Sequence, residues 1–193
     1  MKLVQGVGIN DLPRGSCSER IDGKQTVYPF YDKWHGMIRR CYSRKLHQRH
    51  STYSGCSVCE EWKTLSKFKE WFDQQPLERY SWDLDKDLLL PDNKVYSPET
   101  CILVPHWLNT FVVESNAIRG QYMVGVYWEK QKGKFKSYIS DGTGKMKSLG
   151  LFTDELSAHI AWKAAKLQMV HDRKDELNQI DHRLYDALVK RYS

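Results

Sequence analysis

The sequence predicts an α+β fold, in which small antiparallel strands combine with separate amphipathic helices. Three observations support this prediction. Apolar residues recur at three- and four-residue steps after Pro29 and again after Ser66, as in helices that cover a core. Residues 83–104 read as a short hairpin, followed by a helical segment. Residues 122–152 read as three strands, and another helix pattern follows them.

Composition limits the classes of partner. The chain has 193 residues, enough for one medium domain or two small ones. Its formal net charge of +6 favours an anionic partner. No apolar run approaches the ~20 residues that span a bilayer, and the first ten residues lack the apolar stretch of a signal peptide. We therefore expect no membrane partner and a cytoplasmic location.

Five cysteines in a cytoplasmic chain are expected to be reduced thiols or metal ligands. Cys56 and Cys59 form half of a zinc ribbon, and no second pair of this kind follows. Other cysteines and histidines would have to complete a Zn²⁺ site, namely Cys41, Cys101, His47 and His50. Burial as free thiols is the commoner outcome.

The first part of the chain reads as an extension followed by two helices. Residues 1–28 are polar, with a short edge strand suggested by Val4, Val7 and Ile9. The helix from Pro29 ends in a basic cluster formed by Arg39, Arg40, Arg44 and Lys45. These cations either bind phosphates, with Arg39 and Arg40 as the expected DNA contacts, or simply complement the helix dipole. A second helix begins at Ser66 and ends before Pro76.

The hairpin pattern holds three carboxylates: Asp83, Asp85 and Asp87. Leu88 to Leu90 extend the first strand, Asp92 and Asn93 supply the turn, and the run Cys101 to Val104 returns. Pro105 then opens a short helix that carries His106, Trp107, Asn109 and Phe111.

This layout resembles the HNH, or ββα-metal, endonucleases, in particular their bacteriophage members. The matching residues run in order over residues ~30–110 and include Trp34, Met37, Arg40, Cys41, Val58 to Trp62, Leu84 to Asp87 and Tyr96 to Glu99. Lys86 stands where the family has its general-base histidine, and Thr100 stands where it has its central asparagine. The resemblance places the chain in the cytoplasm of an infected bacterial host.

The resemblance implies a divalent metal ion, Mg²⁺ or Mn²⁺, held by Asp85 and Asn109, with Asp87 or Glu99 as a third ligand. Lys86 is expected to stabilise charge rather than to act as a base, because adjacent aspartates favour its protonated form. Activation of water then falls to the metal or to a neighbour such as His106.

A domain boundary is expected at residues 112–121, where apolar periodicity is lost. The strands that follow are expected at 122–128, 134–140 and 145–152, with turns at Lys132-Gly133 and at 141–144. Alternation places Lys134, Lys136 and Tyr138 on one face. Asp154 caps the next helix, whose Leu156, Ile160, Ala164 and Leu167 are expected to cover the other face.

This half resembles the plant APETALA/ethylene-response-factor DNA-binding domain. The residues that carry the likeness include Gly125, Trp128, Gly133, Phe135, Gly144, Gly150, Phe152 and Ala158. The resemblance implies that the sheet enters the major groove of double-stranded DNA. The implied contacts are Trp128, Lys130, Lys134, Lys136, Tyr138 and Lys147. Lysines replace most of the family's arginines, which favours phosphate contact over guanine reading. The alternative is an exposed basic sheet whose lysines only keep the protein soluble.

The sequence thus predicts four segments: an extension at 1–28, an HNH-like domain at 29–112, a DNA-binding domain at 121–172 and a terminal helix at 173–193. Two functions remain open. One is a metal-dependent DNA endonuclease. The other is an inactive HNH fold that binds DNA or a host protein factor.

Overall fold

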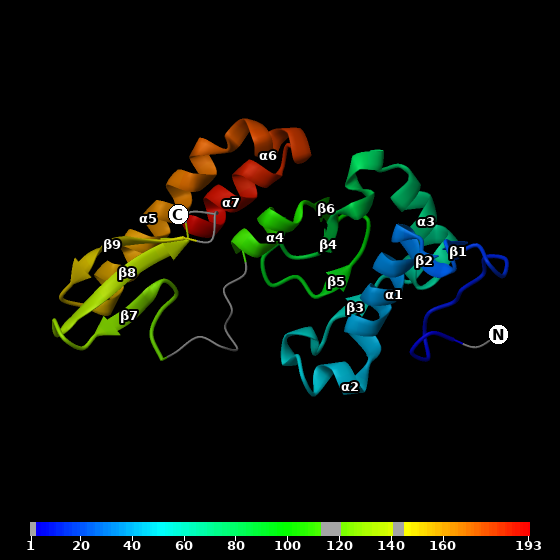
Figure 1. Cartoon of the computed structure of the whole chain (residues 1–193), viewed down its shortest axis with the longest axis horizontal. Coiled ribbons are helices and arrows are strands. Elements are labelled where there is room, and N and C mark those ends of the chain that lie inside the picture. The colour runs from blue at the N-terminus through cyan, green and yellow to red at the C-terminus, as the bar shows by residue number, and fades with distance from the viewer. Residues whose placement is uncertain (1–2, 113–120, 141–144) are drawn as a thin grey trace. The chain divides into compact units, whose positions relative to one another are not determined.

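The computed structural model describes residues 3–112, 121–140 and 145–193. It has an α+β fold with several helices and small sheets, as predicted, and divides into two compact units, Met1–His106 and Trp107–Ser193 (Figure 1). Most of the predicted boundary, residues 113–120, lies outside the described residues, as does the predicted turn at 141–144.

The helices of the first unit begin where the apolar periodicity begins. Helix α1 spans Pro29–Tyr42, with proline in its first turn, and is followed by the short α2 at Arg44–His47. Helix α3 spans Leu65–Asp73. Three 3₁₀ turns connect the elements: η1 at Ser51–Tyr53, η2 at Glu61–Lys63 and η3 at Leu77–Ser81.

The strands of the first unit are short and differ from the predicted hairpin. Strand β4, Asp83–Asp85, pairs antiparallel with β6, Ile102–Val104, and β5, Val95–Tyr96, pairs parallel with β3, Ser57–Val58. The prediction that Leu88 to Leu90 extend the first strand is wrong, because the chain turns away directly after Asp85. The segment between β4 and β5 is a loop of bends and turns.

The core of this unit lies between α1, α3 and the short strands. Trp34 and Trp62 are fully buried, and Trp34 Nε1 donates a hydrogen bond of 2.7 Å to the Trp62 carbonyl oxygen. Aromatic side chains of α3 complete the cluster, with Phe68 packed edge-on against Trp62. Large aromatic side chains therefore form much of the core of this unit.

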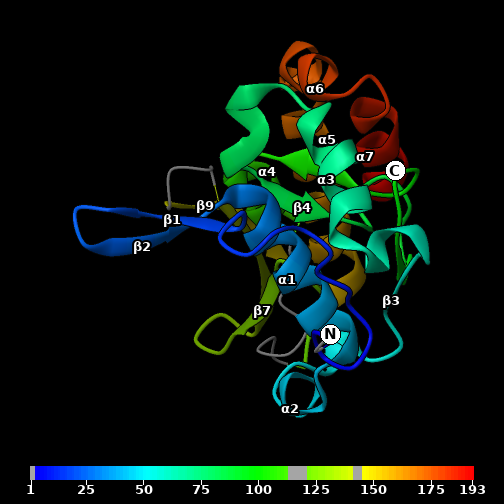
Figure 2. The same cartoon turned by 90° about the vertical axis from the view of Figure 1, so that its right-hand side faces the viewer.

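The N-terminal extension is more ordered than its polar composition indicated. Ile9 pairs with the segment before α3, through hydrogen bonds to Lys63 and from Leu65. A hairpin that the sequence did not predict, β1 at Ser18–Ile21 and β2 at Lys24–Val27, extends away from α1 with most of its side chains exposed (Figure 2). Asp22 and Gly23 form its turn with positive φ.

In the second unit, three antiparallel strands form the predicted sheet. Their order is β7, Val126–Glu129; β8, Lys134–Ser140; and β9, Met146–Phe152. A bulge in β9 opposite Ser137 and Tyr138 places Leu149 as an extra residue. Short α4, His106–Val112, precedes this sheet in the chain.

Helix α5, Glu155–Asp172, packs on the sheet, and Asp154 caps it by accepting a hydrogen bond of 2.8 Å from the Ser157 amide. The predicted face of this helix is wrong. Leu156 and Ile160 are more than half exposed and Ala164 is exposed, whereas Ala158, Trp162 and Val170 are buried. Gly125 explains why the face with Trp162 is the buried one, because the Trp162 ring lies directly against the backbone of Gly125.

The C-terminal segment forms two helices where one was predicted. Helix α6 spans Lys174–Ile180 and α7 spans Leu184–Tyr192, which packs on α5. The apolar residues that recur at helical spacing in this segment are buried, namely Leu177, Ile180, Leu184, Leu188 and Tyr192. None of the helices in the described ranges combines the length and apolar character that crossing a bilayer requires.

Candidate functional site

The carboxylate of Asp85 ends strand β4. Its Oδ1 atom accepts hydrogen bonds from the backbone amides of Asp87, at 2.9 Å, and Leu88, at 2.7 Å. An aspartate that binds the amides two and three residues ahead turns the chain sharply. Asp85 therefore has a structural task, and its Oδ2 atom is the remaining oxygen for a ligand.

The side chain of Lys86 is buried below the loop. Its ammonium group donates to Asp87 Oδ2 at 2.7 Å and to the Asn93 carbonyl oxygen at 2.9 Å, and it lies 5.8 Å from the centre of the Tyr96 ring. A carboxylate and a carbonyl oxygen thus occupy the ammonium group and hold the side chain in place. The expectation that Lys86 stabilises charge rather than acts as a base stays a prediction.

Asn93 holds the other end of the loop, a role that the sequence analysis missed. Its Nδ2 atom donates to the carbonyl oxygens of Lys86, at 2.6 Å, and Val95, at 2.7 Å, and its Oδ1 accepts from the Val95 amide at 3.1 Å. Thr100, the predicted counterpart of the central asparagine, makes one bond of 2.8 Å to the Val95 carbonyl oxygen. The sequence showed Asn93 only as a turn residue.

His106 and Asp83 form a hydrogen-bonded pair at the start of α4. The ring Nδ1 of His106 lies 2.8 Å from Asp83 Oδ2, and the His106 side chain is 81% exposed. Asp83 and Asp85 are two residues apart on β4 and share a face, while Leu84 is buried on the other. The sequence indicated His106 but not Asp83 as its partner.

Burial and the nearby Asp87 carboxylate raise the pKa of Asp85 to about 6. Two acids in one loop disfavour the ionised form of the more buried one, and a nearby cation would relieve the repulsion. Lys86 supplies one positive charge to Asp87 from below. Oxygen ligands of this kind suit Mg²⁺ or Mn²⁺.

The remaining predicted ligands are Glu99 and Asn109. Glu99 is exposed, and a hydrogen bond with the Ser97 side chain lowers its pKa. Asn109 belongs to the second compact unit, so its joint ligation with Asp85 stays a prediction. Across the described ranges, no group of three or more His, Cys, Asp or Glu side chains is arranged to hold a metal ion.

The cysteines are free thiols, including Cys56 and Cys59. Cys41, Cys56 and Cys101 are buried, and burial raises the pKa of Cys41 and of Cys101 to about 12. The surroundings of these two thiols favour the protonated form.

The two arginines assigned to DNA contact have different environments. Arg39 is exposed on α1. Arg40 points inward, where its Nε donates to the Tyr96 hydroxyl at 2.9 Å and its guanidinium carbon lies 5.5 Å from the ring centre. Burial raises the pKa of Tyr96, so the phenol is neutral. Arg40 thus fixes α1 to β5.

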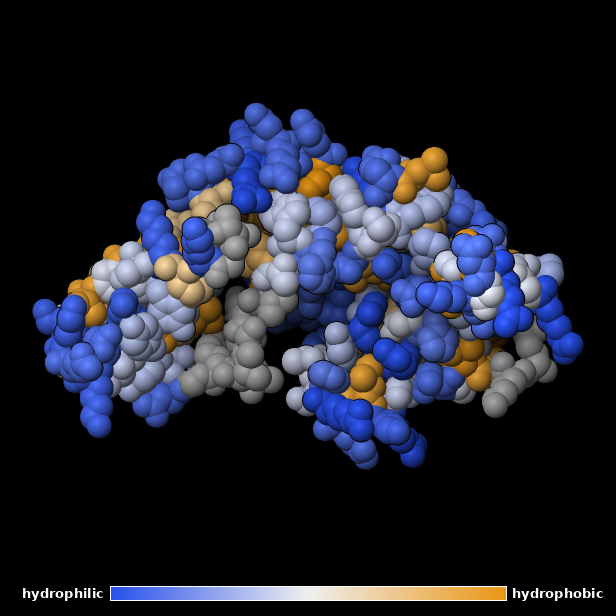
Figure 3. Space-filling view, viewed as in Figure 1, coloured by the Kyte–Doolittle hydropathy of each residue, from blue (hydrophilic) through white to orange (hydrophobic). Residues whose placement is uncertain are grey.

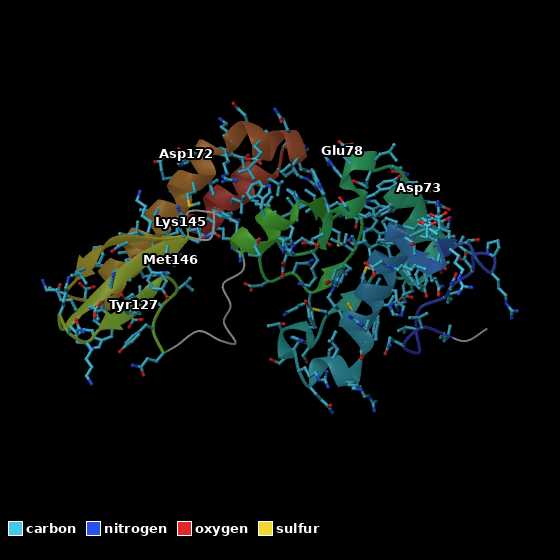
Figure 4. All side chains as sticks on the ribbon, in the orientation of Figure 1. Asp73, Glu78, Tyr127, Lys145, Met146 and Asp172 are labelled. Atoms are coloured by element: carbon cyan, nitrogen blue, oxygen red, sulfur yellow. The ribbon has the colours of Figure 1, made fainter. Side chains whose placement is uncertain are left out.

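In the second unit, one face of the sheet is open and carries aromatic and basic residues. Lys134, Lys136 and Tyr138 alternate on β8, and Tyr127 and Glu129 stand opposite Lys136 and Lys134 on β7. The Lys136 ammonium lies 5.7 Å from the Tyr127 ring centre, and the two tyrosine rings meet edge to face. Tyr127 and Met146 mark β7 and the start of β9 in Figure 4.

Strand register separates two of the predicted DNA contacts from this open face. Trp128 pairs with Phe135, which alternates with Lys134 and Lys136, and their rings are 4.9 Å apart. Lys147 pairs with buried Ile139, because the bulge shifts the alternation of β9. Both side chains are exposed, yet the register places them on the opposite face from Lys136. Lys130 is exposed in the turn after β7.

Comparison with protein-family models, with curated proteins and with solved structures found no match to this chain.

Proposed function

We propose that the protein is a DNA-binding endonuclease of HNH-like design, which hydrolyses phosphodiesters with a divalent metal ion. The observation that carries this proposal is the hydrogen bond between His106 and Asp83, on the same strand face as Asp85. A carboxylate-oriented, exposed imidazole beside a second carboxylate is a suitable arrangement for activating water near a phosphate.

In this proposal His106 replaces Lys86 as the base. Asp83 accepts the Nδ1 proton of the ring, and Nε2 is the ring nitrogen that would take a proton from water. Asp85 and Asn109 would hold Mg²⁺ or Mn²⁺, with Asp87 as a further oxygen ligand. When bound, the ion would neutralise the scissile phosphate and the leaving oxygen.

DNA binding is assigned to the open face of the second unit. Lys134 and Lys136 supply positive charge there, and Tyr127 and Tyr138 supply aromatic surface beside Lys136. Lysines are suited to phosphate contact, so we expect affinity that depends strongly on salt and weakly on sequence.

The test is incubation of the purified protein with supercoiled plasmid and with phage DNA, in Mg²⁺, Mn²⁺ or chelator. The proposal expects nicked or linear products with either metal and none with chelator. Asp85→Ala should abolish cleavage and leave DNA affinity nearly unchanged, because Asp85 is not among the residues assigned to DNA contact. Cleavage by Asp85→Ala at the wild-type rate would place the site elsewhere.

One observation favours the second candidate, an inactive fold that binds DNA or a host factor. Both Lys86 and Asp85 Oδ1 are occupied by bonds that shape the loop, as they would be in a hairpin kept for its structure. Tight DNA binding by the wild type without cleavage in either metal would favour this function.

A further inference from the structure

A strongly basic surface lies at the C-terminal end of α1 and over α2. It consists of Arg39, Arg44, Lys45, Arg49 and Lys94, all of them exposed, and we refer to it as the basic corner. Figure 3 shows strongly hydrophilic side chains gathered over α2. It lies in the first unit and is separate from the lysines of the sheet.

The charge of the basic corner is not balanced within the described part of the chain. No Asp or Glu occurs between Asp32 and Glu60 in the sequence. The lysines near α3 each pair with an acid, as Lys63 with Glu60, Lys67 with Glu70 and Lys69 with Asp73. Among the described ion pairs of the first unit, none includes a residue of the basic corner.

The basic corner is held in place by the surrounding fold. His47, on α2, lies with Nε2 2.7 Å from the Arg40 carbonyl oxygen, which ties α2 to the end of α1. Lys94 donates to the Thr52 carbonyl oxygen at 3.2 Å, and its own carbonyl accepts from the Ser57 amide at 2.8 Å. The positive charges therefore sit on connected, hydrogen-bonded segments rather than on a loose tail.

We infer that the basic corner is a second binding surface for the DNA backbone, on the same unit as Asp85 and His106. Three of its five members are arginines, whose planar guanidinium groups bind phosphate oxygens through paired hydrogen bonds. An anionic membrane is the other extended polyanion. Membrane-binding surfaces also carry several large apolar side chains, whereas α1 and α2 expose none and Val95, beside Lys94, is 40% exposed.

This inference rests on the proposed function and adds a positioning role to it. Arg40 reaches from α1 to the Tyr96 hydroxyl, and the Tyr96 ring lies between Arg40 and Lys86. Lys86 in turn holds the loop that begins at Asp85. A duplex bound at the basic corner is thereby kept at a fixed offset from Asp85, whatever the DNA contacts of the second unit.

The experiment uses full-length protein and a fluorescein-labelled duplex of about 30 base pairs, with affinity measured from low to moderate salt in chelator. One variant carries Arg44→Gln, Lys45→Gln and Arg49→Gln. The matched control carries Lys63→Gln, Lys67→Gln and Lys69→Gln, which removes the same charge from residues already paired with acids. Thermal unfolding checks that both variants are folded.

We measure the slope of log K against log salt concentration. Its magnitude should be smaller in the basic-corner variant than in the wild type by at least about 2, because each phosphate contact contributes about 0.9 to it. The control should keep the wild-type slope within about 0.5. The two triple variants should differ in salt slope by the same amount when Lys134→Gln and Lys136→Gln are added to each of them. Equal slopes for the two triple variants would overturn the inference, as would loss of binding to phosphatidylserine vesicles with the DNA slope unchanged.

The two proposals fail in different ways. If the basic-corner variant changes the salt slope but the wild type fails to cleave DNA in either Mg²⁺ or Mn²⁺, the nuclease proposal is wrong and the binding surface is supported. Metal-dependent cleavage with equal slopes contradicts the binding surface alone.

Discussion

Lys86 and Asn93 donate hydrogen bonds to each other's backbone carbonyl oxygens, with Lys86 Nζ 2.9 Å from the Asn93 oxygen and Asn93 Nδ2 2.6 Å from the Lys86 oxygen. The two ends of the loop between β4 and β5 are thereby joined by side chains rather than by strand pairing. Residues 86–94 consequently keep a fixed shape without belonging to a sheet, and this shape determines where Asp85 and Asp87 lie.

Asn93→Ala should destabilise the first unit by about 2–3 kcal/mol, because three hydrogen bonds of roughly 1 kcal/mol each are lost. Urea unfolding at neutral pH measures the effect. Gln75→Ala, which removes one side-chain bond to the Trp71 carbonyl oxygen, is the control and should change stability by less than about 1 kcal/mol. An Asn93→Ala protein as stable as wild type would contradict the role of this side chain.

His106→Gln should lower metal-dependent cleavage by about 10²- to 10⁴-fold, which is the usual contribution of a general base. Lys86→Met keeps the length of the buried side chain and should reduce stability more than it reduces the rate per folded molecule. Asp83→Asn should lower the rate less than His106→Gln, because orientation is weakened while the base remains. The comparison uses single-turnover rates on a short duplex. A larger rate loss for Lys86→Met than for His106→Gln would return the base role to Lys86.

Stability in chelator should fall as pH rises from about 4 to about 6. The folded-state pKa of Asp85 is raised from 3.8 to about 6, so between these values the folded state binds more protons than the unfolded state. The free energy of unfolding then decreases by at most about 3 kcal/mol across this window. Asp85→Asn retains an oxygen that can accept the Asp87 and Leu88 amide protons but cannot ionise.

The Asp85→Asn variant should therefore be more stable than wild type at pH 7, by roughly 1–3 kcal/mol, and should lose the dependence on pH in this window. Urea titrations at several pH values measure both effects. Adding Mg²⁺ should raise the stability of the wild type and not of the variant, if Asp85 is a ligand. Parallel pH profiles for the two proteins would contradict the raised pKa.

Lys136→Gln should weaken DNA binding and lower the magnitude of the salt slope by about 1, the contribution of one phosphate contact. Lys147→Gln removes the same charge from the same sheet, but the register places Lys147 on the opposite face. It should leave the slope within about 0.3 of wild type. Equal effects of the two substitutions would indicate general charge attraction rather than an oriented surface.

Gly125→Ala should destabilise the second unit strongly. An added Cβ would lie 2.1 Å from Cδ1 of Trp162, and the backbone φ of +77° is unfavourable for alanine. We expect a loss of about 3 kcal/mol or more. Gly133→Ala, at φ +58° in open space, isolates the backbone effect and should cost about 1 kcal/mol. Hydrogen exchange of the β7 and β8 amides measures both.

Elements with one strong period could be predicted from the sequence. Helix α1 starts at Pro29 as expected, and β8 matches its predicted residues 134–140, because alternation and helical spacing reflect which side chains are buried. Helix α5 is apolar on more than one face. Its period alone could not choose between Leu156 and Trp162, and the choice depended on Gly125, which is distant in the sequence.

The candidate site shows the same limit. The resemblance to the HNH family predicted Asp85 as a metal ligand and His106 as a neighbour that could activate water, and both roles stay predictions. The Asp83 partner depends on the pairing of β4 with β6, where Asp83 stands opposite Val104, two residues before His106. The bulge in β9 likewise moved Lys147 to another face than strict alternation predicts. Interactions between distant segments decide such details, and local patterns do not contain them.

The inward-pointing Arg40 has an electrostatic consequence. Its partner, the Tyr96 phenol, is neutral. The phenol therefore does not cancel the positive charge of Arg40, as a carboxylate partner would. The potential above α1 therefore includes a source that substitution or acetylation of surface lysines leaves untouched. The charge of Arg40 should therefore still attract a polyanion and speed its diffusional encounter with the protein, even after every exposed cation of the basic corner has been neutralised.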